Sequence, residues 1–229
     1  MELNADFSKR VLIHSRDVPW TPSPMEGVHR RMLDRIGDEV ARATTIVRYA
    51  PGSHFSAHVH TGGEEFVVLE GVFQDEDGDY PVGSYVRNPP TSKHTPGAAE
   101  GCVIFVKLWQ FDADDRSPIR SDMNAGLEPT EQKGVRARVL FEDERETVRV
   151  EEWAPGTEVH KAMPEGAELL VLSGSLREGE DELALHSWLR VPMGGALAGK
   201  AGAQGARVWI KTRHLRFAEP PRFTEPAAV

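Results

Sequence analysis

Cysteine and long apolar runs are scarce in this sequence. Its 229 residues contain one cysteine, Cys102, which excludes an internal disulfide and any zinc cluster built from cysteines. No run approaches the roughly 18 apolar residues of a membrane span, and the N-terminus lacks the basic-then-apolar order of a signal peptide. We therefore expect a cytoplasmic protein with no membrane partner. Within the apolar run CVIFVKLWQF, Cys102 is expected in a buried strand, with a reactive thiol as the alternative.

Positive charge is also in deficit. The chain has 27 Lys and Arg against 36 Asp and Glu, a formal net charge of −9. Binding to a phosphate backbone needs an excess of basic side chains over the contact face, so we expect no nucleic-acid partner. Hydrophobic residues at 39% and charged residues at 28% are instead ordinary for a globular protein. The length suits two domains of about a hundred residues each.

What the sequence does contain is a group of metal-ligand residue types between Gly52 and Gly71, where it reads GSHFSAHVHTGGEEFVVLEG. His58 and His60 are separated by one residue, so both imidazoles point to the same face of an extended strand. Glu64 follows a short turn that returns a carboxylate to that face. Such donors suit Zn, Fe, Mn, Ni or Cu better than Ca or Mg. The pattern predicts a metal site with a further ligand downstream.

Neighbouring residues have weaker claims to this site. Glu65 points to the opposite face if the strand alternates, and the choice of Glu64 over Glu65 depends on the spacing to Gly71. We expect Glu65 at the surface or beside the ligands. The same expectation holds for three histidines outside the pattern, which are His14, His29 and His54.

The chain repeats itself at an offset of 103 or 104 residues. The repeated pairs are Ala-Pro-Gly at 50–52 and 154–156, VVLEG at 67–71 and LVLSG at 170–174, GSYVRNP at 83–89 and HSWLRVP at 186–192, and GCVIFVK at 101–107 and GARVWIK at 205–211. Four pairs in the same order indicate a tandem duplication. The two copies are expected to pack together as an intramolecular pseudo-dimer, and homo-oligomers are left open.

Each copy contains short β-rich runs bounded by Gly, Pro and Asp. In the first copy the runs are 27–36, 40–50, 56–60, 64–74, 83–88 and 102–111. This spacing predicts an antiparallel sandwich or barrel. The run at 27–36 also fits a helical face, but its counterpart from Gly134 alternates, so both are interpreted as the first arm of a hairpin.

The domain organisation follows from the repeat. The polar segment 112–133 reads as a linker, which places a first domain at 1–125 and a second at 126–218. The tail at 219–229 is expected to be disordered. The run Val11–Ile13 is expected to add an edge strand or to cover a sheet face.

The spacing resembles the two motifs of the cupin family. The first motif is matched by Gly52, His58, His60, Glu64 and Gly71, and the second by Gly83, Pro89 and His94. Thr91 and Ala98 depart from the second motif, where Gly is usual and Asn is frequent, and these departures affect the turn more than the ligand. The resemblance implies an all-β fold of two tandem cupin jelly-roll barrels, with His94 as the fourth ligand.

The second copy does not repeat the metal pattern. The positions that correspond to the four candidate ligands are, in order, Ala162, Pro164, Glu168 and Leu197. We therefore expect one divalent metal ion per chain, in the first copy.

The run 26–96, with GCVIFVKLWQF after it, is similar to the cupin-like domain of the anti-sigma factor ChrR. In that family the four motif residues bind one zinc, which implies zinc at His58, His60, Glu64 and His94, with iron or manganese as alternatives. ChrR proteins also carry an N-terminal anti-sigma domain with a histidine and cysteine zinc site. This chain has neither, so direct inhibition of a sigma factor is not expected.

Two function classes follow, and both use the same four residues. The first is a regulatory module that senses a ligand or stress and contacts a protein partner. The second is an Fe-dependent dioxygenase acting on a small diketone or phenolic compound. Four protein ligands fill a tetrahedral zinc site, whereas six-coordinate iron or manganese leaves two positions for chemistry. We expect the regulatory module. Phe66 and Val68 would share the Glu64 face, so a small apolar or chelating ligand is expected.

Overall fold

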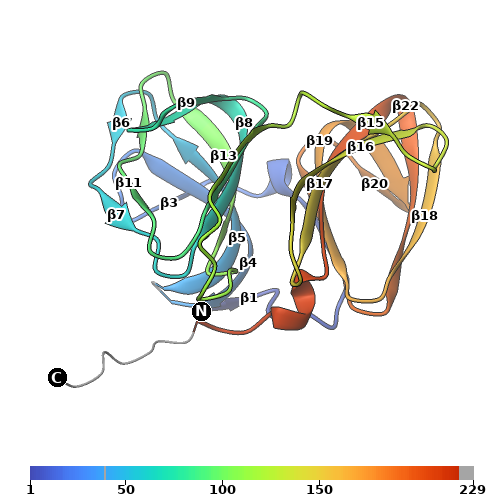
Figure 1. Cartoon of the computed structure of the whole chain (residues 1–229), viewed down its shortest axis with the longest axis horizontal. Coiled ribbons are helices and arrows are strands. Elements are labelled where there is room, and N and C mark those ends of the chain that lie inside the picture. Colours follow the sequence, from blue (N-terminus) through green and yellow to red (C-terminus); the bar gives the residue numbers. More distant parts are fainter. Residues whose placement is uncertain (39, 222–229) are drawn as a thin grey trace.

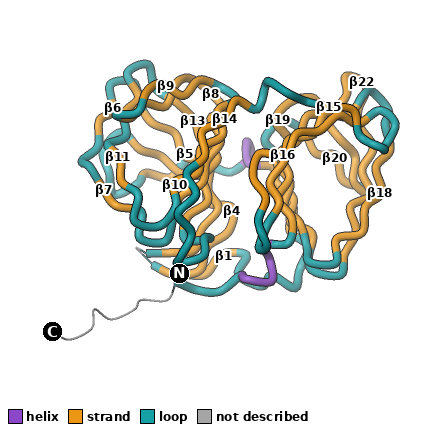
Figure 2. Tube along the Cα trace, in the orientation of Figure 1, coloured by secondary structure: helices purple, strands orange, loops and turns teal. Residues whose placement is uncertain are grey.

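The computed structural model describes residues 1–38 and 40–221, and it is all-β as expected (Figure 1). The helical segments of this described part are the short 3-10 turns η1 (Ser15–Asp17) and η2 (His214–Phe217). Figure 2 shows the strands gathered in two lobes. No helix among the described residues is long and apolar enough to cross a membrane. Most of the tail predicted to be disordered, 222–229, lies outside the described residues.

The strands form two large sheets and one small pair. Eleven strands form one sheet, along the path β1-β4-β5-β13-β8-β10-β14 with β3, β6, β9 and β12 attached beside it, and β7 pairs with β11. We call these strands the first lobe. Nine strands, along the path β15-β16-β17-β22-β19-β21-β2 with β18 and β20 attached, form the second lobe. The predicted all-β class is confirmed. Both sheet paths are open among the described pairings, and closure into two barrels therefore stays a prediction.

The strand bounds follow in chain order. The first lobe contains β1 (Glu2–Leu3), β3 (Thr21–Pro22), β4 (Val28–Gly37), β5 (Ala41–Tyr49), β6 (Ser53–His54), β7 (His58–Val59), β8 (Glu64–Asp75), β9 (Gly78–Pro81), β10 (Ser84–Asn88), β11 (Lys93–His94), β12 (Gly97–Ala98), β13 (Cys102–Leu108) and β14 (Ile119–Asp122). The second contains β2 (Val11–His14), β15 (Glu128–Pro129), β16 (Val135–Glu142), β17 (Thr147–Trp153), β18 (Glu158–Met163), β19 (Ala167–Glu178), β20 (Asp181–Leu183), β21 (Ser187–Val191) and β22 (Gly195–Thr212).

The predicted hairpins are confirmed, because β4 pairs with β5 and β16 with β17, both antiparallel. Two other predicted runs are shorter in the structure. The run at 56–60 keeps only β7, and the run at 102–111 ends at Leu108 because Trp109 has a φ of 58°. The run Val11–Ile13 lies in an edge strand, β2, on the sheet of the second lobe.

The linker prediction for 112–133 was wrong in part. This segment contains β14, which pairs with β10, and β15, which pairs with β16. Met123 and Leu127 are buried against both lobes. The large apolar residues of this polar stretch, Ile119, Met123 and Leu127, are four positions apart and do not alternate as a strand would, which is why the sequence read as a linker. The domain boundary near 125 stays a prediction.

The duplication is visible in β8 and β19, which both have 12 residues and start 103 residues apart. Gly71 and Gly174 occupy equivalent places with φ of 70° and 69°. A Cβ at either glycine would lie 2.1 Å from a carbonyl oxygen, that of Gly101 or Gly205. Only glycine meets this backbone requirement, so both copies kept it.

Three apolar clusters fill the molecule. One lies within the first lobe and includes Phe66 and Val68, and another lies within the second. The third, which we call the inter-lobe cluster, has members from both lobes. At its centre the rings of Phe105 and Trp209, from equivalent strands, meet edge to face with centroids 5.2 Å apart.

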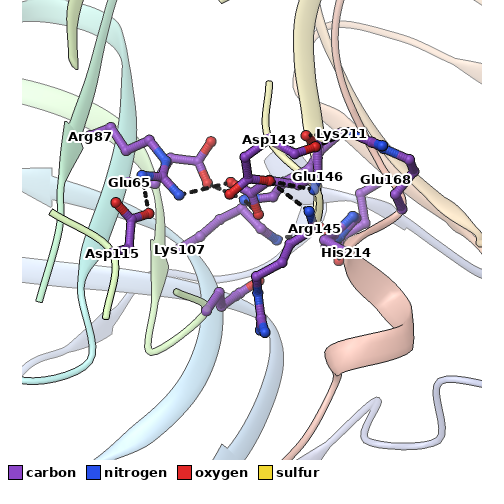
Figure 3. Close-up of polar contacts among 12 residues, drawn as sticks. Glu65, Arg87, Lys107, Asp115, Asp143, Arg145, Glu146, Glu168, Lys211 and His214 are labelled. Atoms are coloured by element: carbon purple, nitrogen blue, oxygen red, sulfur yellow. Dashed lines mark hydrogen bonds and ion pairs between the residues drawn. The ribbon is translucent and has the colours of Figure 1, made fainter. Parts of the chain in front are cut away.

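Buried charges accompany the inter-lobe cluster (Figure 3). Within each lobe a glutamate and a lysine are cross-strand neighbours, Glu65 with Lys107 and Glu168 with Lys211. Their ion pairs nevertheless cross between lobes: Lys211 Nζ lies 2.5 Å from Glu65 Oε2, and Lys107 pairs with Glu168. The prediction that Glu65 faces away from Glu64 is therefore supported, but its expected place at the surface or beside the ligands was wrong.

Candidate metal centre

The four candidate ligands come from three neighbouring segments of the first lobe. His58 on β7 and His94 on β11 are register partners in this small antiparallel pair. His60 follows β7 directly, and its backbone N–H donates to the Ser92 carbonyl, which ties it to the β11 side. Glu64 is the first residue of β8. The two-strand pair therefore brings residues 34 positions apart, His60 and His94, to one place.

The donor atoms converge on one centre. The ligand atoms of His58, His60 and His94 all lie within 4.8 Å of one another. The Nε2 atoms of His60 and His94 are 3.2 Å apart, and Glu64 Oε2 lies 3.3 Å from His60 Nε2 and 3.6 Å from His94 Nε2. His60, Glu64 and His94 are buried, while His58 is exposed. The structure thus brings together all four residues, and whether they bind a metal stays a prediction.

Contacts at the far ring nitrogens fix the imidazoles. His94 Nδ1 lies 3.3 Å from the Asp75 carboxylate and His58 Nδ1 lies 3.3 Å from the Ser56 carbonyl. Both partners only accept, so each Nδ1 must carry the proton and each Nε2 keeps its lone pair toward the centre. His60 Nδ1 lies 3.0 Å from Ser92 Oγ.

The environment of Glu64 favours its ionised carboxylate form. Asn88 Nδ2 donates to Glu64 Oε2 at 3.1 Å. Burial acts to raise the pKa of Glu64, but the hydrogen bond from His60 and the charges of His60 and His94 outweigh it and lower the pKa to about 2. Burial also lowers the pKa of His94, and the Glu64 carboxylate opposes this shift without reversing it.

The geometry fits one transition-metal ion. Metal–ligand bonds of about 2.1 Å in a tetrahedron separate the ligand atoms by about 3.4 Å. The separations among His60, Glu64 and His94, which are 3.2, 3.3 and 3.6 Å, bracket this value, and the His58 ligand atom lies within 4.8 Å of those of His60 and His94. Three imidazoles and one carboxylate, with hydrogen bonds behind them, suit zinc, iron or manganese.

A cavity of about 340 Å³ opens beside the donors. It is lined by Arg30, Arg35, Val40, Ala41, the segment 58–64, Leu108 and Trp109. Phe66 and Val68, expected to form an apolar pocket wall, are instead buried in the core of the first lobe. The lining is therefore mixed, with apolar side chains and two arginines.

The second lobe has no such group among its described residues. The sequence-based counterpart of His94, Leu197, was right, whereas those of His58, His60 and Glu64 were off by one. The register partners of β18 and β22 place Lys161 opposite Leu197, as His58 lies opposite His94. The pairing of β19 with β21 makes Ala167, not Glu168, the counterpart of Glu64. Glu168 is equivalent to Glu65 and faces the other lobe.

The remaining histidines and the cysteine lie outside the group. His14 and His54 are exposed, and His29 is half-buried on β4. Cys102 is a buried strand residue as predicted, and burial raises the pKa of its thiol to about 12, which argues against the reactive alternative.

Sequence reasoning missed the residues that hold the ligands, which are Asp75, Asn88 and Ser92. Asn88 lies in the second motif segment GSYVRNP, one residue before its proline, and could have been noticed there. Asp75 and Ser92 carry no spacing signal, because their contacts depend on the fold.

Comparison with known proteins agrees with this architecture. Residues 8–112 match the model of the ChrR cupin-like domain. The matches support membership of the cupin superfamily. A candidate dioxygenase from Nostoc punctiforme is 15% identical with a TM-score of 0.73, covering 96% of this chain and 88% of that one. Protein Ylba from E. coli is 14% identical with a TM-score of 0.67, covering 96% and 95%.

More distant cupin-fold structures include enzymes. A variant of oxalate decarboxylase from Bacillus subtilis is 14% identical with a TM-score of 0.61, covering 88% of this chain and 76% of that one. No curated protein sequence matches this chain. At these identities the structural likeness shows the fold alone.

Proposed function

We propose that this chain is a metal-binding bicupin that works as a regulatory, ligand-sensing or stress-sensing module, with one divalent ion, zinc first, held by His58, His60, Glu64 and His94. The observation that supports this most directly is the convergence of three imidazoles and one carboxylate, with His60, Glu64 and His94 at separations that suit a single ion. The match to the ChrR cupin-like domain supports the regulatory role. A bound zinc would lock β7, β11 and the start of β8 together, and a ligand that alters this site would change the surface offered to a protein partner.

A second candidate function is an Fe-dependent dioxygenase acting on a small diketone or phenolic compound. The observation that favours it is the cavity beside the donors, which leaves room for a ligand next to the ion. One similar structure is described as a candidate dioxygenase and another is an oxalate decarboxylase. Iron would supply oxygen activation, while the cavity residues would orient the substrate and limit access of water.

Metal content tests the shared part of both proposals. Elemental analysis of the purified protein should give one equivalent of metal per chain, and the double variant His58→Ala, His60→Ala should give none while remaining folded. The fold should survive because His58 is exposed and both positions lie outside the three apolar clusters. His160→Ala, an exposed histidine of the second lobe, is the matched control and should keep the full equivalent. Metal retained by the double variant would reject this site.

Oxygen uptake separates the two functions. Protein loaded with Fe(II) under anaerobic conditions should, on the regulatory proposal, consume no oxygen when diketones or phenols are added. Uptake that depends on substrate, exceeds that of free iron and disappears in His94→Ala would replace the regulatory proposal with the enzymatic one.

We also propose that the duplication fused a pair of single cupin domains, so that the inter-lobe cluster is the former dimer interface. Support comes from the equivalent strands that face each other there, β13 with Phe105 and β22 with Trp209. The crossed ion pairs between lobes are what a two-fold interface would produce.

A further inference from the structure

The cavity beside the donors contains an arginine on the interior face of the first lobe. On β4, Val28 and Arg30 share a face because side chains two residues apart in a strand point the same way. Val28 is part of the core of the first lobe, and the register partner of Arg30 is Val47, another member of that core. Arg30 therefore extends inward, where it lines the cavity with His58, His60 and Glu64.

Arg30 has no counter-charge among the described residues. Its Nε is buried and makes no hydrogen bond, and no ion pair joins its guanidinium to an acid there. A buried guanidinium donor without an acceptor is costly. Seven arginines among the described residues have such an Nε, and Arg30 is the one of them that lines the cavity beside the donors.

The neighbouring Arg31 also has a buried Nε without a hydrogen bond, but its guanidinium has other contacts outside the cavity. It lies over the Trp20 ring at 4.1 Å and donates to the Arg16 carbonyl at 3.2 Å. It does not line the cavity beside the donors.

The second arginine of the cavity strengthens the positive field. Arg35 donates to the backbone carbonyls of Gly37 and Asp38, which are neutral acceptors. Burial lowers the pKa of Arg35 and repulsion from Arg30 adds to this shift, while the Asp38 carboxylate opposes it, so the two guanidinium groups act on one region. The Asp38 carboxylate pairs with the N-terminal ammonium of Met1.

The cavity has less negative than positive charge among its lining residues. Glu64 is the one acidic residue among the described residues that line the cavity, and it is a proposed metal ligand. With a divalent ion bound, its charge is used by the ion, and the cavity carries a net positive charge. Leu108 and Trp109 contribute apolar lining to the same cavity.

We propose that this cavity binds a small organic acid, whose carboxylate is received by Arg30 beside the metal ion and whose apolar part packs against Leu108 and Trp109. A guanidinium fork matches the two oxygens of a carboxylate, and about 340 Å³ suits a small ligand. The inference rests on the proposed metal site and specifies its ligand class, which differs from the uncharged diketones or phenols considered above.

Calorimetric titration of the zinc-loaded protein tests this proposal. The probes are malonate and phenylacetate, each compared with its neutral amide, in chloride-free buffer, with zinc content measured before and after each titration. The carboxylates should bind and the amides should not. Arg30→Met should keep one zinc and lose carboxylate affinity by about tenfold or more, the usual effect of removing a charged hydrogen bond. Arg30→Lys should recover part of it, and Arg31→Met should match the natural protein.

The outcomes separate this inference from the metal proposal. Full zinc content with equal binding of acids and amides, with binding of no carboxylate, or with unchanged affinity in Arg30→Met would overturn the ligand class and leave the metal site standing. Absence of zinc from the natural protein would reject the metal site. Carboxylate binding that still depends on Arg30 in that protein would support the arginine as an anion site.

Discussion

The two lobes have equivalent strands but carry different side chains at equivalent positions. In the first lobe, positions 60, 64 and 94 hold buried polar donors, and in the second lobe their counterparts are Met163, Ala167 and Leu197, all buried in the apolar cluster of that lobe. The second lobe therefore shows that the fold is stable when this place is filled by hydrocarbon. The fold therefore does not require the donors of the first lobe, which are held by hydrogen bonds to Asp75, Asn88 and Ser92.

The interface between the lobes is also unequal, although its strands are equivalent. On one side Glu65, Glu146 and Asp115 surround Lys211 and Arg87, which makes three acids and two cations. On the other side, two acids face three cations. The acids are Glu168 and Asp34, and the cations are Lys107, Arg190 and Arg42. Removing a lysine should therefore lower the free energy of unfolding more on the side with three acids than on the side with two.

The largest expected effect is on the free energy of unfolding, when a buried lysine is removed from one side of this interface. Lys211→Met leaves three buried acids with Arg87 alone, and we expect the free energy of unfolding to fall by about 3–5 kcal/mol. Lys107→Met leaves Glu168 beside His214, 3.1 Å away, and near Arg42, so its loss should be roughly half as large. Urea denaturation of both variants measures the difference. Equal losses would mean that the two sides are energetically equivalent.

The next largest effect is a pH dependence of stability, which His214 causes. Burial lowers the pKa of His214 to about 4, although the Glu168 carboxylate opposes the shift. The folded state thus holds fewer protons than the unfolded state between pH 4 and 6.5, and the stability from neutral His214, complete above pH 6.5, is lost as the pH falls toward 4. The loss should be about 3 kcal/mol at most.

The measurement is the free energy of unfolding at several pH values in this window, in the natural protein and in His214→Gln. The variant should show a flatter pH dependence, while His160→Gln, an exposed histidine of the same lobe, should leave the slope unchanged. An identical slope in His214→Gln would assign the acid sensitivity to other groups.

The smallest expected effect tests the equivalence of the lobes. Gly71→Ala and Gly174→Ala should each cost about 2 kcal/mol, because both add strain at positive φ and a contact with a backbone carbonyl oxygen. Gly52→Ala is the control, since its φ is 76° but no atom lies within 4 Å of the added Cβ, and its cost should be about half. Thermal unfolding provides the comparison. A difference of more than a factor of two between Gly71→Ala and Gly174→Ala would show that the equivalence does not extend to these turns.

Local sequence determined a large part of this molecule. The alternation of side chains and the short turn after His60 were enough to place His58, His60 and Glu64 on one face, because these effects act over a few residues. The repeat and the strand periodicity predicted the all-β class and the paired hairpins for the same reason.

Tertiary structure alone decided what covers each face. The sequence predicted that Glu65 points away from Glu64, but not that Lys211, 146 residues later, would reach it. It also gave no sign that Arg30 would line the cavity or that Asp75 would hold His94. Alternation fixes the direction of a side chain relative to its own strand, whereas the partner in that direction depends on which distant strands the whole chain packs against it.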